Sequence, residues 1–100
     1  MKPSHALSLA NQGNPRAIAQ IINKRLRKKG VIAKVTRQGH SICITLEAVY
    51  APQRKILLPL LWHTLKALDA KTVQNATIRA KRFNCQHIIW FEELPLVPSK

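Results

Sequence analysis

Basic side chains are the residues in this sequence best suited to chemistry with a partner, and they occur in clusters. Lys and Arg number 17 against 4 Asp and Glu, which gives a formal net charge of +13. Each Lys or Arg that neutralises a phosphate releases a condensed counterion, so such clusters favour binding to nucleic acid. The largest cluster contains seven basic residues and no acid: Lys24, Arg25, Arg27, Lys28, Lys29, Lys34 and Arg37. A second cluster consists of Arg79, Lys81 and Arg82.

A charge surplus of this size implies a negatively charged partner. It causes self-repulsion in the folded chain, which such a partner would offset. Nucleic acid is the most common partner of this kind, ahead of anionic membranes and acidic proteins. Basic residues near the end of a helix also interact favourably with its dipole, but that explains only about two or three of the charges. We therefore expect a nucleic-acid-binding protein, with RNA or single-stranded DNA favoured.

Residues that usually carry catalysis are few and scattered. The acids are Glu47, Asp69, Glu92 and Glu93, and adjacent residues on a strand face opposite sides of it. The sequence has no glycine-rich phosphate loop and no Ser/His/Asp arrangement. Cys85 and His87 would share a strand face and form a thiolate–imidazole pair at most, whereas a mixed surface is the more common explanation. The sequence predicts no enzyme, no cofactor and no metal site.

Signals for export or membrane insertion are not found in the sequence. Its beginning is polar, without the apolar core of a signal peptide. The longest apolar run, residues 56–62, contains Pro59 and falls far short of the ~20 residues that span a bilayer. Two cysteines, Cys43 and Cys85, fit neither a disulfide framework nor a zinc site. We expect a cytoplasmic protein with reduced thiols and no transmembrane segment.

The largest basic cluster begins on a predicted helix. Asn14 is a suitable N-cap, and Pro15 suits the first helical position, where its missing N–H is not needed. Gly30 ends the helix at a position that favours a left-handed residue. Between them the helical period of one buried stripe runs through Ile18, Ile21, Ile22 and Leu26.

The rest of the chain alternates strands with one more helix. Residues 31–36 and 41–47 show the two-residue period of strands and predict a hairpin around Gln38-Gly39. A second helix opens at Ala51-Pro52; Pro59 either kinks it or marks a later start near Leu58. Two further strands are predicted at residues 73–82 and 85–91, with a turn at Phe83-Asn84.

These elements predict one α+β domain at residues 13–94, with a flexible leader (1–12) and a flexible tail (95–100). The order helix-strand-strand repeats at an offset of about 38 residues, from Asn14 to Pro52. We expect a two-layer αββαββ sandwich, with a four-stranded antiparallel sheet and both helices on one face. The connection we favour is a permuted ferredoxin-like fold with strand order 3-4-2-1, which makes the second and fourth strands central.

Three segments carry a family resemblance: Gln12 to Ala19, Gly30 to Val35 and Trp90 to Leu94. They resemble a small domain that recurs in cyanobacterial proteins, in which Asn or Asp followed by Pro precedes an Ala-Ile-rich helix. The resemblance covers about residues 11–94. It implies a cyanobacterial source and a fold, because the family has no assigned activity. This chain differs from the family in being more basic.

The sheet face away from the helices is a more specific candidate site than the basic clusters alone. Lys34, Arg79 and Lys81 are expected there, together with one aromatic of the fourth strand, either Phe91 or Trp90. Four-stranded RNA-binding sheets stack bases on aromatic rings and hold phosphates with Lys and Arg. No ribonucleoprotein-type aromatic motif is present, and an equally reasonable reading places both aromatics in the core or in a dimer interface.

Two other functions compete with this prediction. Apolar Ile32, Ile89 and Phe91 on an open face would suit a protein–protein or homodimer interface. The basic residues 24–29 would suit peripheral attachment to an anionic membrane, although the first helix has few bulky residues beside them.

Overall fold

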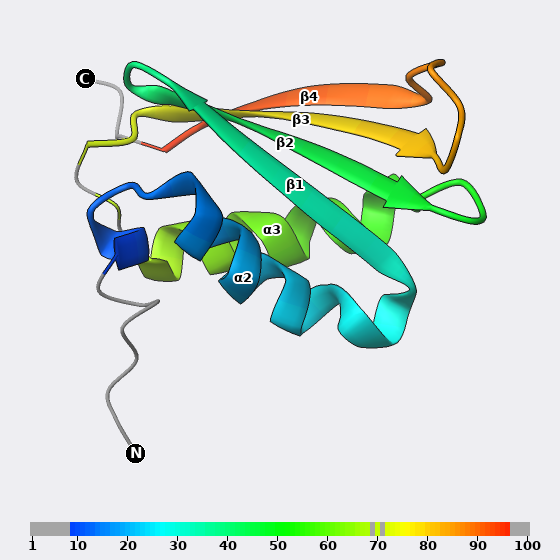
Figure 1. Cartoon of the computed structure of the whole chain (residues 1–100), viewed down its shortest axis with the longest axis horizontal. Coiled ribbons are helices and arrows are strands. Elements are labelled where there is room, and N and C mark those ends of the chain that lie inside the picture. The colour runs from blue at the N-terminus through cyan, green and yellow to red at the C-terminus, as the bar shows by residue number, and fades with distance from the viewer. Residues whose placement is uncertain (1–8, 69, 71, 97–100) are drawn as a thin grey trace.

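Within the described residues, two long helices and four strands follow one another in the predicted order, with both long helices on one face of the sheet (Figure 1). The computed structural model describes residues 9–68, 70 and 72–96. The elements are α2 (Pro15–Leu26), the 3₁₀ turn η1 (Arg27–Lys29), β1 (Val31–Gln38), β2 (Ser41–Ala48), α3 (Arg54–Leu68), β3 (Asn75–Arg82) and β4 (Trp90–Pro95). The α+β class and the two-layer arrangement are as predicted. Within the described residues, no helix has the length and hydropathy needed to cross a membrane.

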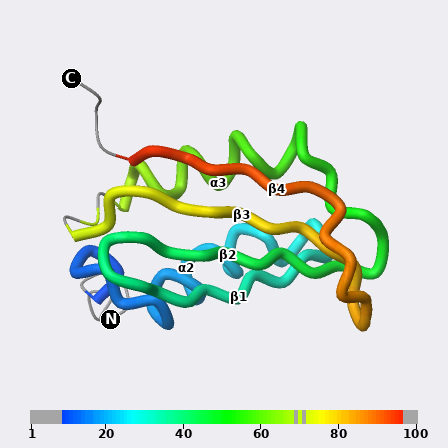
Figure 2. The backbone as a smooth tube through the Cα atoms, turned by 90° about the horizontal axis from the view of Figure 1, so that it is seen from above, coloured from blue at the N-terminus to red at the C-terminus, as the bar shows by residue number. Residues whose placement is uncertain are grey.

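The sheet topology differs from the prediction. The strands lie in the order β1-β2-β3-β4, with β2 and β3 parallel and the other two pairs antiparallel. An all-antiparallel sheet in the order 3-4-2-1 is therefore wrong, and β4 is an edge strand (Figure 2). The cause is α3, which connects β2 to β3 as a crossover, so the two strands run side by side in the same direction.

Local signals at both ends of α2 act as expected. The backbone N–H of Ala17 donates to Oδ1 of Asn14 over 3.0 Å, and Pro15 occupies the first turn. Gly30, at φ 70°, follows η1 in the left-handed conformation. Ile18, Ile22 and Leu26 are buried against the sheet.

Helix α3 begins before Pro59 and continues through it. Its first residue is Arg54, so the later start near Leu58 is wrong. The exposed Pro59 ring points away from the core, and its missing N–H leaves the carbonyl of Lys55 without an i+4 donor. Leucines of α3 (Leu57, Leu61, Leu65 and Leu68) cover the sheet.

One core fills the space between the two layers. On the helix side, β2 contributes Ile42, Ile44 and Leu46, all at most 1% exposed. Strand β3 contributes Ala76, Ile78 and Ala80, all fully buried. Side chains at the intervening positions therefore form the open face of the sheet.

The fourth strand lies later in the chain than predicted. It spans Trp90–Pro95 and not residues 85–91, and the segment between β3 and β4 is a loop that includes Asn84 at φ 59°. Part of the expected leader also belongs to the fold, because Ala10 is buried and Asn11 Nδ2 donates to the carbonyl of Leu68 over 2.8 Å. The rest of the leader and tail, residues 1–8 and 97–100, lies outside the described residues.

Candidate nucleic-acid interface

Five basic residues of the largest cluster lie exposed on the last turns of α2 and on η1. All five side chains are exposed, and none forms an ion pair with another described residue. Because Ile22 and Leu26 face the core, the basic residues between and directly after them face solvent. They are Lys24, Arg25, Arg27, Lys28 and Lys29.

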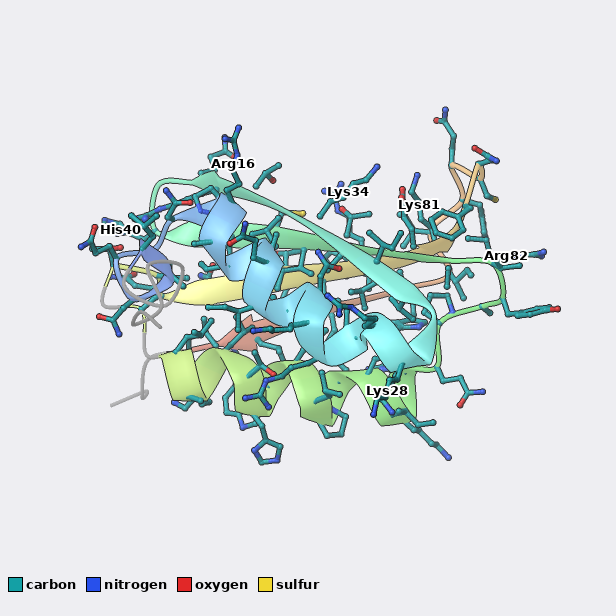
Figure 3. All side chains as sticks on the ribbon, turned by 60° about the horizontal axis from the view of Figure 1, so that its bottom comes forward. Arg16, Lys28, Lys34, His40, Lys81 and Arg82 are labelled. Atoms are coloured by element: carbon teal, nitrogen blue, oxygen red, sulfur yellow. The ribbon has the colours of Figure 1, made fainter. Side chains whose placement is uncertain are left out.

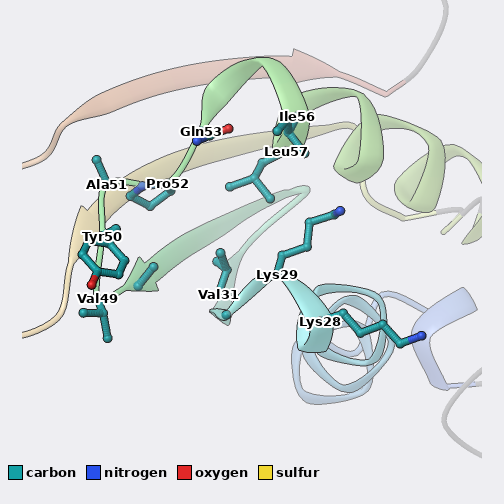
Figure 4. Close-up of a pocket in the computed structure, with 12 residues that line it drawn as sticks. Lys28, Lys29, Val31, Val49, Tyr50, Ala51, Pro52, Gln53, Ile56 and Leu57 are labelled. Atoms are coloured by element: carbon teal, nitrogen blue, oxygen red, sulfur yellow. The ribbon is translucent and has the colours of Figure 1, made fainter.

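A groove of about 560 Å³ separates η1 from the beginning of α3 (Figure 4). We call it the end groove. Its lining contains no acidic side chain and is mainly apolar: Lys28, Lys29, Gly30, Val31, Ala48, Val49, Tyr50, Ala51, Pro52, Gln53, Ile56 and Leu57. Three large apolar residues of this lining are unusually exposed, namely Val49 at 60%, Tyr50 at 81% and Ile56 at 49%.

The first turn of α3, which contributes Ile56 and Leu57 to the end groove, also contains two basic residues. Arg54 and Lys55 occupy the first turn of α3, which contains no acid. Cations at this end of a helix oppose its dipole, whose positive end lies there. Arg54 pairs with Glu92 of β4, while Lys55 forms no ion pair with a described residue. An anion bound near the end groove would relieve this unfavourable arrangement.

On the open face of the sheet, one cross-strand row joins four of its side chains. The register places Lys34 opposite Thr45, Thr45 opposite Arg79, and Arg79 opposite Phe91. Phe91 is 51% exposed in this row. Because β4 is an edge strand, Phe91 has a basic neighbour, Arg79, on one side only, and the predicted central position of the fourth strand is wrong.

Trp90 belongs to the other face of β4. Its partner in the register is Ala80, a core residue. The indole Nε1 donates to the carbonyl of Pro52 over 2.8 Å and so ties β4 to the segment before α3. Of the two aromatics, Phe91 is therefore the one that faces the open side.

Glu47 reduces the positive charge of the open face. Its carboxylate is 3.2 Å from Nζ of Lys81 and 3.3 Å from Nζ of Lys34, so it bridges the strands on both sides of β2. Burial alone would raise the pKa of Glu47, but hydrogen bonds and positive charge from Lys81 and Lys34 outweigh burial and hold the pKa below the usual value. With Glu93 also facing this side, opposite Thr77, the acids offset most of the charge of the open-face cations. Figure 3 shows Lys34 and Lys81 on the sheet side and Lys28 on the helical side.

A shallow hollow of about 240 Å³ lies over the same face, where the β3–β4 loop turns back across the sheet. The loop contributes Gln86 and Ile88, and the strands contribute Thr45, Arg79 and Lys81. Sequence periodicity placed residues 85–89 in a strand and therefore did not predict this hollow.

Arg37 and Arg82, the two remaining residues of the predicted binding site, stabilise loops by donating hydrogen bonds to backbone carbonyls. Arg37 Nε donates to the carbonyl of Gly39 over 2.8 Å, and its Nη1 donates to the carbonyl of Gly13 over 3.0 Å. Arg82 Nε donates to the carbonyl of Val49 over 3.2 Å, next to the end groove. The charge of Arg37 lies at the opposite end of β1 from η1, away from the main cluster.

The end groove itself was not predicted. Its signal in the sequence is an aromatic, Tyr50, two residues before Pro52 and four before a helix that begins with Arg54-Lys55. Helices usually begin with acidic residues, so a basic first turn marks a position where an anion would be favourable.

Other reactive groups are not brought together. The described residues contain no group of three or more His, Cys, Asp or Glu placed to hold a metal ion. Cys43 and Cys85 are free, partly buried thiols. Cys85 lies in the β3–β4 loop and not on a strand, so it does not share a strand face with His87.

No family model, curated protein or solved structure matches this chain.

Proposed function

We propose that this protein binds nucleic acid through a basic surface at one end of its helical layer. This surface, the basic end, consists of Lys24, Arg25, Arg27, Lys28 and Lys29 of α2 and η1 together with Arg54 and Lys55 of α3. The observation that carries the proposal is a groove whose lining contains two lysines of η1 and no acid, and whose other wall belongs to the start of α3, where the first turn holds Arg54 and Lys55.

The basic end fits phosphate better than the open sheet face does. On the open face, Glu47 already pairs with both Lys34 and Lys81. At the basic end, only Arg54 is paired with a described residue. Unpaired cations attract the phosphate backbone and raise association rates, and they do so without reading sequence.

Salt dependence tests this proposal directly. Fluorescence anisotropy would follow binding of labelled 20-nucleotide RNA, single-stranded DNA and duplex DNA over a KCl series. We expect micromolar or tighter binding at about 50 mM salt, and a log–log slope near −5 on duplex DNA if about six phosphates are contacted. Replacing Lys24, Arg25, Lys28 and Lys29 by Gln should flatten the slope by roughly 3–4 units. Binding that ignores salt, or no binding at 50 mM, would overturn the proposal.

A matched control separates the basic end from net charge. Arg16 and Lys66 lie at the opposite ends of α2 and α3, away from the end groove. Replacing this pair by Gln removes as much charge as replacing Lys28 and Lys29. We expect the Lys28/Lys29 variant to weaken binding more; equal losses would show that total charge and not the basic end controls affinity.

A second candidate function is self-association through the open face. Phe91 and Ile32, at 51% and 47% exposed, leave apolar surface there. Sedimentation over a concentration series, with Phe91→Glu as the variant, tests it. A monomer at all concentrations would exclude this function.

A further inference from the structure

We propose that the end groove receives an unpaired base of single-stranded nucleic acid, which stacks on Tyr50 while Lys28 and Lys29 hold its phosphates. This inference rests on the proposed function and adds the class of substrate: strands with unpaired bases in preference to duplexes.

The groove has the size and lining that an unpaired base requires. At about 560 Å³ it lies within the range of pockets that hold small molecules. Its apolar lining includes Val31, Pro52, Ile56 and Leu57. A base that leaves its stack exposes flat, weakly polar surface, and burial against such a lining removes that surface from water.

Tyr50 supplies the aromatic ring. It follows β2 in the loop before α3, and at 81% exposed it contributes little to the core. An exposed ring on the rim of an apolar groove, with lysines on the facing wall, is the combination that binds single strands: stacking for bases and cations for the backbone. Neither the core nor a described hydrogen bond explains the position of Tyr50.

Lys29 is placed to hold a phosphate at the groove, and Lys28 is placed to hold a neighbouring phosphate outside it. Figure 4 shows Lys29 extending from η1 toward the α3 side of the groove and Lys28 pointing away along the outside of the molecule. Both are exposed, so a phosphate can reach them without displacing protein contacts. Arg54 and Lys55 adjoin Gln53 and Ile56 of the opposite wall and extend the positive surface past the groove.

The same geometry disfavours duplexes and leaves one rival ligand. A paired base enters a concave site only after it is flipped out, which requires unstacking and unpairing. An acidic peptide with an apolar side chain would also satisfy lysines beside an apolar groove. The exposed Tyr50 favours the nucleic acid, and the test below includes the peptide as a contrary outcome.

The experiment compares two exposed aromatics at one salt concentration. Anisotropy would measure binding of a labelled 12-nucleotide oligo(dT) and a labelled 12-base-pair duplex to the wild-type protein, Tyr50→Ala, Tyr50→Phe and Phe91→Ala, with folding checked by circular dichroism. We expect Tyr50→Ala to weaken oligo(dT) binding roughly 5- to 150-fold and to leave duplex binding nearly unchanged. Tyr50→Phe keeps the ring and should bind as the wild type does. Phe91→Ala should bind normally, because Phe91 lies on the open face.

The outcomes separate this inference from the proposed function. Normal oligo(dT) binding by Tyr50→Ala, while the Lys28/Lys29 variant loses affinity, overturns the base site and keeps the phosphate-binding surface. If only Phe91→Ala loses affinity for oligo(dT), the base binds on the sheet, and the inference is again overturned. If no nucleic acid binds at all, both proposals fail. Tighter binding of a labelled Glu/Leu dodecapeptide than of oligo(dT), abolished by Ile56→Glu, identifies the groove as a protein-docking site and again overturns it.

Discussion

Glu47 of β2 and Lys81 of β3 form an ion pair with a 3.2 Å separation on the open face of the sheet. The pairing is unusual for its burial, because Glu47 is only 8% exposed although it points away from the helices. Lys34 of β1 approaches the other carboxylate oxygen to 3.3 Å. One acid therefore links three neighbouring strands, and a carboxylate this buried is stable only because both of its oxygens have partners.

This ion pair makes part of the folding stability depend on pH. The pKa of Glu47 is lowered in the folded state, so its contribution is complete above the ordinary pKa of glutamate, about 4.3. That contribution is lost as the pH falls through the lowered value. Urea unfolding of the wild type and Glu47→Gln should differ by about 1 kcal/mol at pH 7 and by less below pH 4. A difference that grows on acidification would contradict the assignment.

Gly13 and Gly30 allow a matched test of backbone strain. Both have positive φ, but a Cβ on Gly13 would clash with Nη1 of Arg37 and Oγ1 of Thr72, while a Cβ on Gly30 meets nothing within 4 Å. Gly13→Ala should lower the free energy of unfolding by about 2–3 kcal/mol, and Gly30→Ala by about 1 kcal/mol. Denaturant unfolding of both variants measures the difference; equal losses would show that Arg37 moves aside easily.

Asn23 protects one edge of the sheet. Its side chain donates to the carbonyl of Ala33 over 2.9 Å and accepts from the N–H of Ala33 over 2.7 Å. It therefore satisfies both backbone hydrogen-bonding groups that Ala33 turns toward the outer edge of β1. Asn23→Ala should destabilise the fold by about 1–2 kcal/mol and speed hydrogen exchange at the Ala33 amide. Gln20→Ala, an exposed change on the same helix, is the control and should affect neither measurement. Unchanged exchange at Ala33 would contradict the role of Asn23.

Local signals predicted the elements of this fold better than their arrangement. Asn14, Pro15 and Gly30 define the ends of the first helical segment because capping and left-handed backbone depend on residues close in sequence. Periodicity of two likewise identified the three strands β1, β2 and β3. That periodicity does not specify which strands become neighbours, so it could not predict the parallel pairing of β2 with β3. The prediction of a strand at residues 85–91 was wrong for another reason. Both alternating sets of side chains in this segment are partly apolar, so the period of two gave only a weak signal for a strand.

In the candidate site, too, local features could be predicted from the sequence and the tertiary arrangement could not. The exposure of Lys28 and Lys29 follows from the helical period and was predictable. The end groove was not, because it lies between η1 and the beginning of α3, which are separated in the sequence by two strands. Tyr50 gains its proposed role from its place on this groove, and nothing in its immediate sequence requires that role.

Trp90 and Phe91 provide a final test, because they are adjacent in the chain but face opposite sides of β4. Trp90 packs on the core and donates to Pro52, whereas Phe91 is 51% exposed beside Arg79. Trp90→Ala should cost about 3–5 kcal/mol of stability, since it creates a cavity and leaves the Pro52 carbonyl without its donor. Phe91→Ala should cost less than about 1 kcal/mol.

Urea unfolding of the two variants measures these values, and tryptophan fluorescence from Trp62 remains as a reporter in both. The open-face hypothesis adds a second readout, because a base stacked on Phe91 would make Phe91→Ala lose about 1–3 kcal/mol of single-strand binding. Loss of stability in Phe91→Ala comparable to that in Trp90→Ala would contradict the register of β4. Loss of binding without loss of stability would instead place the single strand on the sheet, where Arg79 and Lys34 would hold its phosphates.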